Sequence, residues 1–297
     1  MRYKLNVILR GVGQVMFQNN PLSGILMLVG LAIGSWEAAL LALAGNGIGN
    51  LTARLCRYPE QDIRNGLYGF NGTLVGIAVG IYFGLNAASL LLLIIGAALS
   101  TGMARFFAFL RKPGFTAPFI LATWILLGLV TFLYPSLRTV SGISVPETSP
   151  LLFRAFSFSI GQVMFEGSSL LTGLLFLAGI FVNDRRGGFY AFWGAVLPLG
   201  IGLLVSDFGA FNAGLYGYNG VLCGIALAGK GGRNFMWATL SVLLSVVLQW
   251  LGISAGIITL TAPFVVSVWT VMALRSSLHR WQNSATDTAT IKTTLKR

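Results

Sequence analysis

Two series of long apolar blocks run along this chain, separated by short polar turns that carry glycine, proline or charged residues. We predict that each block is a membrane-spanning helix, because a crossing needs about 20 mainly apolar residues. The first series covers residues 21–36, 37–53, 66–84, 86–108 and 116–134. The second covers residues 168–183, 188–205, 213–229, 235–252 and 261–276.

A shorter, more polar segment precedes each series, at residues 1–20 and 151–167. Arg10 and the polar run after it argue against a full crossing by the first of these segments. A short helix that enters the membrane part-way fits better, since irregular backbone is tolerated at membrane depth where it lines a cavity. We therefore predict two re-entrant half-helices in addition to the ten spans.

Three motifs occur twice and in the same order. Gly-Gln-Val-Met-Phe at 13–17 recurs unchanged at 161–165, and Leu-Tyr-Gly-Phe-Asn-Gly at 67–72 recurs as Leu-Tyr-Gly-Tyr-Asn-Gly at 215–220. Thr-Ala-Pro-Phe at 116–119 recurs at 261–264. Such ordered self-similarity indicates an internal duplication. It divides the chain into a first repeat (1–134), a connector (135–150), a second repeat (151–279) and a polar tail (280–297).

Five spans in each repeat is an odd number, so the second repeat must enter the membrane from the opposite side. The basic residues test this arrangement, because Lys and Arg gather on the cytoplasmic side. With ten crossings, only Arg138 and Arg154 fall on the far side, which leaves 20 − 2 = 18 on the side of the N-terminus. The sequence thus predicts an all-α polytopic membrane protein in two inverted repeats, with both termini in the cytoplasm.

Composition agrees with a membrane protein: 55% of residues are hydrophobic and 9% are charged, against about 25% charged in ordinary globular domains. The topology accounts for the net charge of +12, so nucleic acid is not an expected partner. His279 is the only histidine, and the eight acidic residues form no pair at metal or proton-relay spacing within a span. We therefore expect no enzyme activity, no metal and no cofactor, and a path for a neutral solute.

Uncharged polar and aromatic residues are the stronger candidates for a solute path. Gln14 and Gln162 are repeat mates, and Phe17 and Phe165 follow them by about one helical turn. Phe70 and Leu74 share one helix face, as do their mates Tyr218 and Leu222, although packing against a neighbouring helix would give the same spacing. Asn71 and Asn219 stand where a turn enters a helix, and capping is the better interpretation for both.

Thr116 and Thr261 each open a helix with proline two residues later, so each is either an N-cap or a hydroxyl that points into the path. Glu166 follows the second Gln-Val-Met-Phe and faces the path, caps a broken helix or contacts lipid headgroups. The residues alone leave these alternatives open.

These motifs resemble the urea transporter family, and the resemblance extends over the whole chain up to about residue 280. It rests on Gln-Val-Met-Phe-Gln-Asn-Asn-Pro-Leu-Ser-Gly at 14–24, Leu-Tyr-Gly-Phe-Asn-Gly-Thr-Leu-Val-Gly at 67–76 and Phe-Thr-Ala-Pro-Phe at 115–119. The resemblance implies a homotrimer in the lipid bilayer, with one urea path in each subunit. Gln14 and Gln162 would then lie at the two mouths, and the walls would consist of Val15, Phe17, Val163 and Phe165. A flat slot would be formed by Phe70, Leu74, Tyr218 and Leu222, with Thr116 and Thr261 at its narrow centre.

We expect a passive, urea-selective channel in a bacterial inner membrane. Tyr218 departs from the phenylalanine of the first repeat, so one vestibule can differ from the other, and a related short amide stays open as a solute. An ion-coupled secondary transporter that uses Glu166 or Asp207 is the alternative from another class. An ammonium channel is less consistent with the sequence, because channels of that kind use paired pore histidines and the spans contain none.

Overall fold

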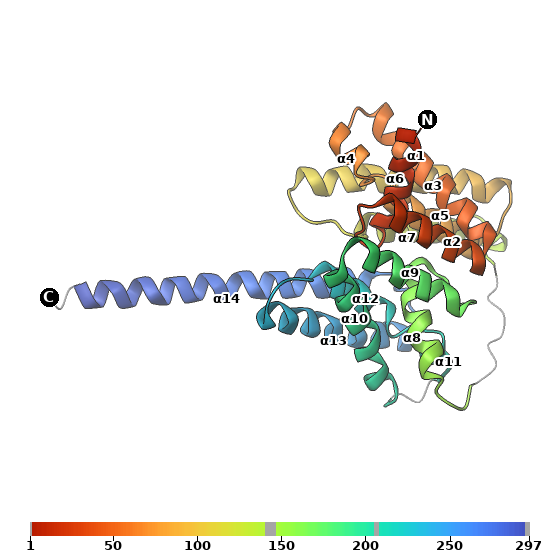
Figure 1. Cartoon of the computed structure of the whole chain (residues 1–297). Coiled ribbons are helices and arrows are strands. Elements are labelled where there is room, and N and C mark those ends of the chain that lie inside the picture. The colour runs from red at the N-terminus through yellow and green to blue at the C-terminus, as the bar shows by residue number, and fades with distance from the viewer. Residues whose placement is uncertain (1, 140–146, 205–207, 295–297) are drawn as a thin grey trace.

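The computed structural model describes residues 2–139, 147–204 and 208–294, and every regular element in these ranges is a helix (Figure 1). The helices of the first part of the chain are α1 (Arg2–Gln14), α2 (Pro21–Gly34), α3 (Trp36–Leu55), α4 (Glu60–Arg64), α5 (Phe70–Phe83), α6 (Ala87–Phe109), α7 (Ala117–Leu133) and the 3-10 turn η1 (Pro135–Leu137). Those of the second part are α8 (Leu152–Gly161), the 3-10 turn η2 (Gln162–Met164), α9 (Leu170–Asn183), α10 (Arg185–Gly202), α11 (Phe208–Asn212), α12 (Tyr218–Ala226), α13 (Gly232–Ser254) and α14 (Ala262–Thr294). The predicted helical fold class is confirmed.

Side chains fix several of the helix starts. Asn20 caps α2 by accepting from the backbone N–H of Leu22, and Pro21 occupies the first position, where its missing N–H costs no helical bond. Ser169 caps α9 in the corresponding way. These caps separate the two short N-terminal segments of the halves, which end near Phe17 and Phe165, from the apolar helices that follow.

Helix length distinguishes two classes of element. α6 and α13 are 23 residues each, about 35 Å at 1.5 Å per residue, which exceeds the roughly 30 Å core of a bilayer. Among the described residues, these two are long and apolar enough to span by length and composition. α2, α5, α7 and α9 are apolar but shorter, because turns replace part of each predicted block.

Glycines bring backbones into direct contact at equivalent places in the two halves. α3 packs on α5 so closely that a Cβ added at Gly45 would lie 2.0 Å from the carbonyl oxygen of Gly72. In the pairing of α10 with α12, a Cβ at Gly194 would lie 2.2 Å from the carbonyl oxygen of Gly220. These glycines thus form helix-packing surfaces, as small residues commonly do between membrane helices.

Contacts between the halves come in reciprocal pairs. The indole N–H of Trp124 in the first half donates to the carbonyl of Ile258 at 2.8 Å, and that of Trp269 in the second half donates to the carbonyl of Pro113 at 2.9 Å. Since 124 and 269 differ by 145, as do 113 and 258, the two bonds join equivalent atoms. A two-fold relation between interacting units gives this reciprocity.

The end of the chain and parts of the connector and of the second half differ from the predicted elements or lie outside the described residues. α14 continues to Thr294, into the residues that the sequence predicts as a polar tail, and projects beyond the other helices (Figure 1). The last predicted membrane span ends at residue 276, where the apolar block ends, but the helix itself continues past that point. Residues 140–146 of the connector and Asp207 lie outside the described residues.

Candidate functional site

The repeated Gln-Val-Met-Phe segments form matching turns at the inner ends of α1 and α8. Gln14 Nε2 donates to the carbonyl of Asn65 at 2.9 Å, and Gln162 Nε2 donates to the carbonyl of Ala213 at 3.2 Å. Phe17 and Phe165 then adopt left-handed backbone conformations, with φ of 62° and 61°. This conformation is uncommon for a residue with a side chain, and it ends the short helix while directing the ring away from it.

The rings of these phenylalanines cross from one half to the other. Phe17 packs edge-to-face against Phe264, with ring centroids 6.1 Å apart, and Phe165 packs in the same manner against Phe119 at 5.9 Å. Phe115 joins the first of these pairs, at 6.0 Å from Phe17 and 5.4 Å from Phe264. Aromatic walls therefore surround the place where the two halves meet.

Thr116 and Thr261 lie at this meeting point. Their Oγ1 atoms are 2.7 Å apart and hydrogen-bonded to each other, and each residue is 2% exposed. Thr116 makes no capping bond to its own helix, although it occupies the N-cap position of α7. The Thr116 hydroxyl therefore does not cap α7 and is directed toward Thr261 of the other half.

Asn71 and Asn219 hold the starts of the helices that carry these threonines. Asn71 Oδ1 accepts from the backbone N–H of Phe119, and Asn219 Oδ1 accepts from that of Phe264, at 3.1 Å in both cases. Capping was thus correct in kind but assigned to the wrong helix, since each asparagine caps a neighbouring helix and not its own. The start of α5 has no side-chain cap.

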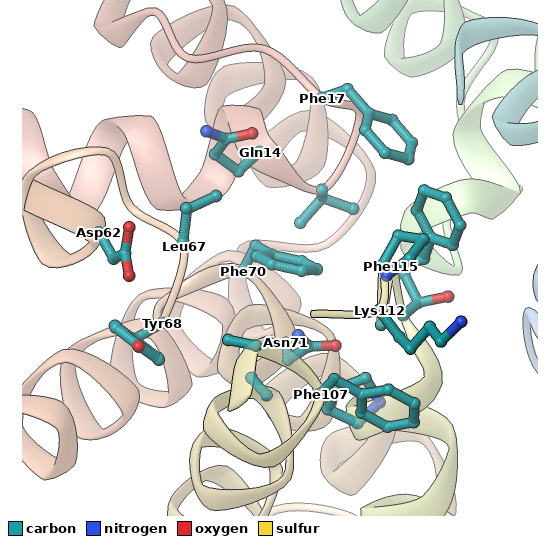
Figure 2. A pocket seen from close by; sticks show the side chains of 17 residues that line it. Gln14, Phe17, Asp62, Leu67, Tyr68, Phe70, Asn71, Phe107, Lys112 and Phe115 are labelled. Atoms are coloured by element: carbon teal, nitrogen blue, oxygen red, sulfur yellow. The ribbon is translucent and has the colours of Figure 1, made fainter. Parts of the chain in front are cut away.

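A pocket of about 290 Å³ opens beside this centre in the first half (Figure 2). Five of the six candidate residues of that half line it, namely Gln14, Val15, Phe17, Phe70 and Thr116. Leu74, the sixth, is fully buried and belongs to the apolar core that surrounds the centre. Figure 2 shows the ring of Phe70 between Gln14, at the end of α1, and the side chains of Asn71 and Phe107.

In the second half, Val163, Tyr218, Leu222 and Thr261 are buried, whereas Gln162 and Phe165 are partly exposed. The Tyr218 hydroxyl donates to the carbonyl of Leu260 at 2.5 Å and lies 3.3 Å from Gln249 Oε1. This hydroxyl is the one polar group that distinguishes Tyr218 from Phe70, and it ties α12 to the turn before α14. The two halves therefore differ in polar contacts at this equivalent position.

Glu166 is buried, and its side chain is hydrogen-bonded within the chain segment before α9. Its Oε1 accepts from the backbone N–H of Ser168 at 2.8 Å and from the Ser168 hydroxyl at 2.5 Å, and its carboxyl group packs on Gly34 at the end of α2. These bonds hold the Glu166 carboxyl group in the turn before α9, whose N-cap is Ser169.

Several residues that take part in this arrangement were not among the sequence candidates. Phe115 and Leu260 have φ of 47° and 50° immediately before the two threonines, and Gln249 bonds to three side chains of the second half. The positive φ values carry no sequence signal, because neither residue is glycine. Gln249 could have been noticed as a carboxamide within a long apolar block.

Comparison with known proteins identifies the family to which the chain belongs. The profile of the family described as "Urea transporter" matches residues 5–276. The chain belongs to the urea transporter family. It is 32% identical over 243 residues to urea transporter 1 of sheep (Ovis aries) and, equally, to that of mouse (Mus musculus). Each alignment covers 75% of this chain and 62% of the relative.

The match to the urea transporter family includes both copies of every duplicated motif, and the resemblance of the motifs to this family is confirmed. The family is one of membrane transporters and not of enzymes. The chain spans about 62% of the length of the curated relatives it matches.

Proposed function

We propose that this chain is a passive, urea-selective channel whose path runs through the aromatic centre between the two halves. The observation that carries the proposal is the contact of Thr116 with Thr261 between the crossed pairs Phe17–Phe264 and Phe165–Phe119. The threonine pair and the crossed rings offer flat apolar walls and two hydroxyl groups and carry no charge themselves, while Asp62 and Lys112 line the pocket beside them. Such a combination suits a small, planar, neutral solute.

The chemistry of urea matches these groups. Its faces are flat and can slide between aromatic and branched side chains, while its edges carry N–H donors that hydroxyl and carbonyl oxygens can accept. These acceptors replace the water that urea sheds on entry. Gln14 and Gln162 would meet the solute at the two mouths, with Val15 and Val163 beside them. Phe70, Leu74, Tyr218 and Leu222 would form the slot on either side of the threonines.

For the membrane arrangement, the proposal is ten spans and two re-entrant half-helices, the latter being α1 and α8. Residues 1–134 and 151–279 would be inverted repeats joined by the connector 135–150, a relation supported by the reciprocal bonds of Trp124 and Trp269. The distribution of basic residues supports cytoplasmic termini, with 280–297 as a cytoplasmic extension. A homotrimer in the bacterial inner membrane is proposed from the family resemblance.

The test is stopped-flow urea efflux from proteoliposomes that contain the purified full-length chain. We expect efflux down a urea gradient with no ion gradient present, at the same rate when a proton or sodium gradient is added. Thiourea and acetamide measured in the same vesicles give the solute range. A flux that requires an ion gradient would contradict the proposal and favour the ion-coupled transporter.

A further inference from the structure

In the described part of the chain, the side-chain amide of Asn71 in the first half lacks a hydrogen-bond acceptor that its repeat mate, Asn219, has in the second half. In the second half, Gln249 Oε1 accepts from Asn219 Nδ2 at 3.2 Å and from the Thr259 hydroxyl at 2.8 Å, with the Tyr218 hydroxyl at 3.3 Å. In the first half, Asn71 is 1% exposed, and its Nδ2 donates to no acceptor among the described residues. A buried amide N–H without a partner is costly, so its position calls for an explanation.

Gln249 of α13 has an equivalent position in α6 of the first half. α6 and α13 are both 23 residues long and start 145 residues apart, at Ala87 and Gly232. Ser100 donates to the carbonyl of Ala97 at 2.9 Å and Ser245 donates to that of Val242 at 2.8 Å, which fixes the same offset. Gln249 therefore corresponds to Ala104.

Ala104 lines the pocket of Figure 2 together with Asn71 and Gly114, and Gly114 corresponds to Thr259. The first half thus lacks the carboxamide and the hydroxyl that fill this place in the second half. The asparagine Oδ1 is fixed on Phe119 N–H as its mate is on Phe264 N–H, so Nδ2 points toward Ala104 as the mate points toward Gln249. What remains is a cavity whose lining includes an N–H donor without an acceptor within the described residues, Asn71 Nδ2, alongside the side chains of Gln14, Asp62 and Lys112.

Packing around the pocket differs in a complementary way. In the first half, a Cβ added at Gly114 would meet the Phe107 side chain at 2.9 Å. In the second half, a Cβ added at Gly252, the equivalent of Phe107, would meet Thr259 Cγ2 at 2.1 Å. The first half thus has Phe107 and Gly114 where the second half has Gly252 and Thr259. An aromatic ring therefore bounds the cavity of the first half, and a threonine hydroxyl takes part in the network of the second.

We propose that the pocket of Asn71, Ala104 and Gly114 binds a neutral amide whose carbonyl oxygen accepts from Asn71 Nδ2. The carboxamide of Gln249 is the built-in equivalent of that ligand, and its C(=O)NH₂ group is the chemistry that urea and acetamide share. Phe107 provides a flat apolar face for the ligand, and the site exists in one half only. Ala104 is then the residue that decides whether the site is open. The choice of urea as the natural occupant rests on the proposed function.

The test uses equilibrium binding of radiolabelled urea, and separately of radiolabelled acetamide, to the purified full-length chain, with urea efflux measured on the same preparations. Ala104→Gln supplies the missing carboxamide and should weaken saturable binding by roughly tenfold or more, because the side chain occupies both the space and the donor. The reciprocal variant Gln249→Ala should open the equivalent pocket and add one saturable site. This second variant is decisive if Ala104→Gln does not fold.

Unchanged binding in a folded Ala104→Gln protein, or no added site in Gln249→Ala, would overturn the site. A wild-type protein that binds amides in a manner sensitive to Ala104 but conducts no urea would contradict the proposed function and support the site. Normal wild-type efflux with binding that ignores both substitutions would contradict the site alone.

Discussion

The hydroxyl oxygens of Thr116 and Thr261 are hydrogen-bonded at 2.7 Å although 145 residues separate them in the chain. Each threonine precedes a helix whose N-terminus is capped by an asparagine of the same half. This cap holds the start of the helix and thereby the position of the threonine hydroxyl. If the solute passes here, the two hydroxyls must separate and accept from its N–H groups in turn. The pair would therefore act as both a constriction and a binding site.

Replacing both residues with valine keeps the volume and removes the two hydroxyls. We expect urea efflux to fall roughly two- to tenfold, since a net hydrogen bond is worth about 0.5–1.5 kcal/mol and the solute would lose acceptors at the narrowest point. Stopped-flow efflux from proteoliposomes with matched protein content measures the change. Thr131→Val, outside this centre at the exposed end of α7, is the control and should leave efflux unchanged. An unaltered rate in the double variant would remove the threonines from the path.

Glycines of α3 allow a direct comparison between a close helix contact and an open position. A Cβ at Gly45 would lie 2.0 Å from the carbonyl oxygen of Gly72, whereas a Cβ at Gly47 would meet nothing within 4 Å. Gly45→Ala should destabilise the fold by about 1–3 kcal/mol through overpacking. Gly47→Ala should be neutral or stabilising by up to about 1 kcal/mol, because alanine is the better helix former. Apparent unfolding temperatures in detergent test this, and equal values for the two variants would contradict the packing of α3 on α5.

Much of this architecture was accessible from the sequence because the duplication repeats whole motifs. The apolar blocks predicted the helices, and the matching Gln-Val-Met-Phe and Thr-Ala-Pro-Phe segments indicated which residues of the two halves correspond. Hydropathy predicted the helix ends less well. The predicted block 66–84 contains α5 at Phe70–Phe83, since the turn that includes Gly66, with φ of 75°, has apolar residues of its own.

The contacts that define the candidate site were harder to predict. Spacing placed Asn71 at a helix start but could not reveal that its partner is Phe119 of α7, because this bond depends on how two helices pack. The difference between Ala104 and Gln249 is visible in the aligned halves, yet its meaning required the position of Asn71 Nδ2. Tertiary hydrogen bonds of this kind leave no periodic signal.

Glu166 provides the test between a channel and an ion-coupled carrier. Its carboxylate accepts from the N–H and the hydroxyl of Ser168, and a glutamine Oε1 can accept from both. Glu166→Gln should therefore retain the turn before α9 and keep urea efflux within about twofold of wild type, since a loss of this size corresponds to less than one net hydrogen bond. Efflux with and without a proton gradient is the measurement. A variant that is folded but inactive would show that the carboxylate takes part in transport.

The two asparagines should differ in their contribution to stability although their caps are alike. Asn71→Ala and Asn219→Ala each leave one backbone N–H without its acceptor, that of Phe119 or of Phe264, at a cost of about 1–3 kcal/mol. Asn219→Ala also removes a donor to Gln249, whereas Asn71 Nδ2 has no acceptor to lose. Asn219→Ala should therefore be the more destabilising of the two by about 1 kcal/mol. Thermal unfolding of both variants in the same detergent, without urea, measures this difference. A larger loss for Asn71→Ala under these conditions would mean that Asn71 Nδ2 already has a partner in the empty protein, and added urea should then stabilise the wild type no more than it stabilises that variant.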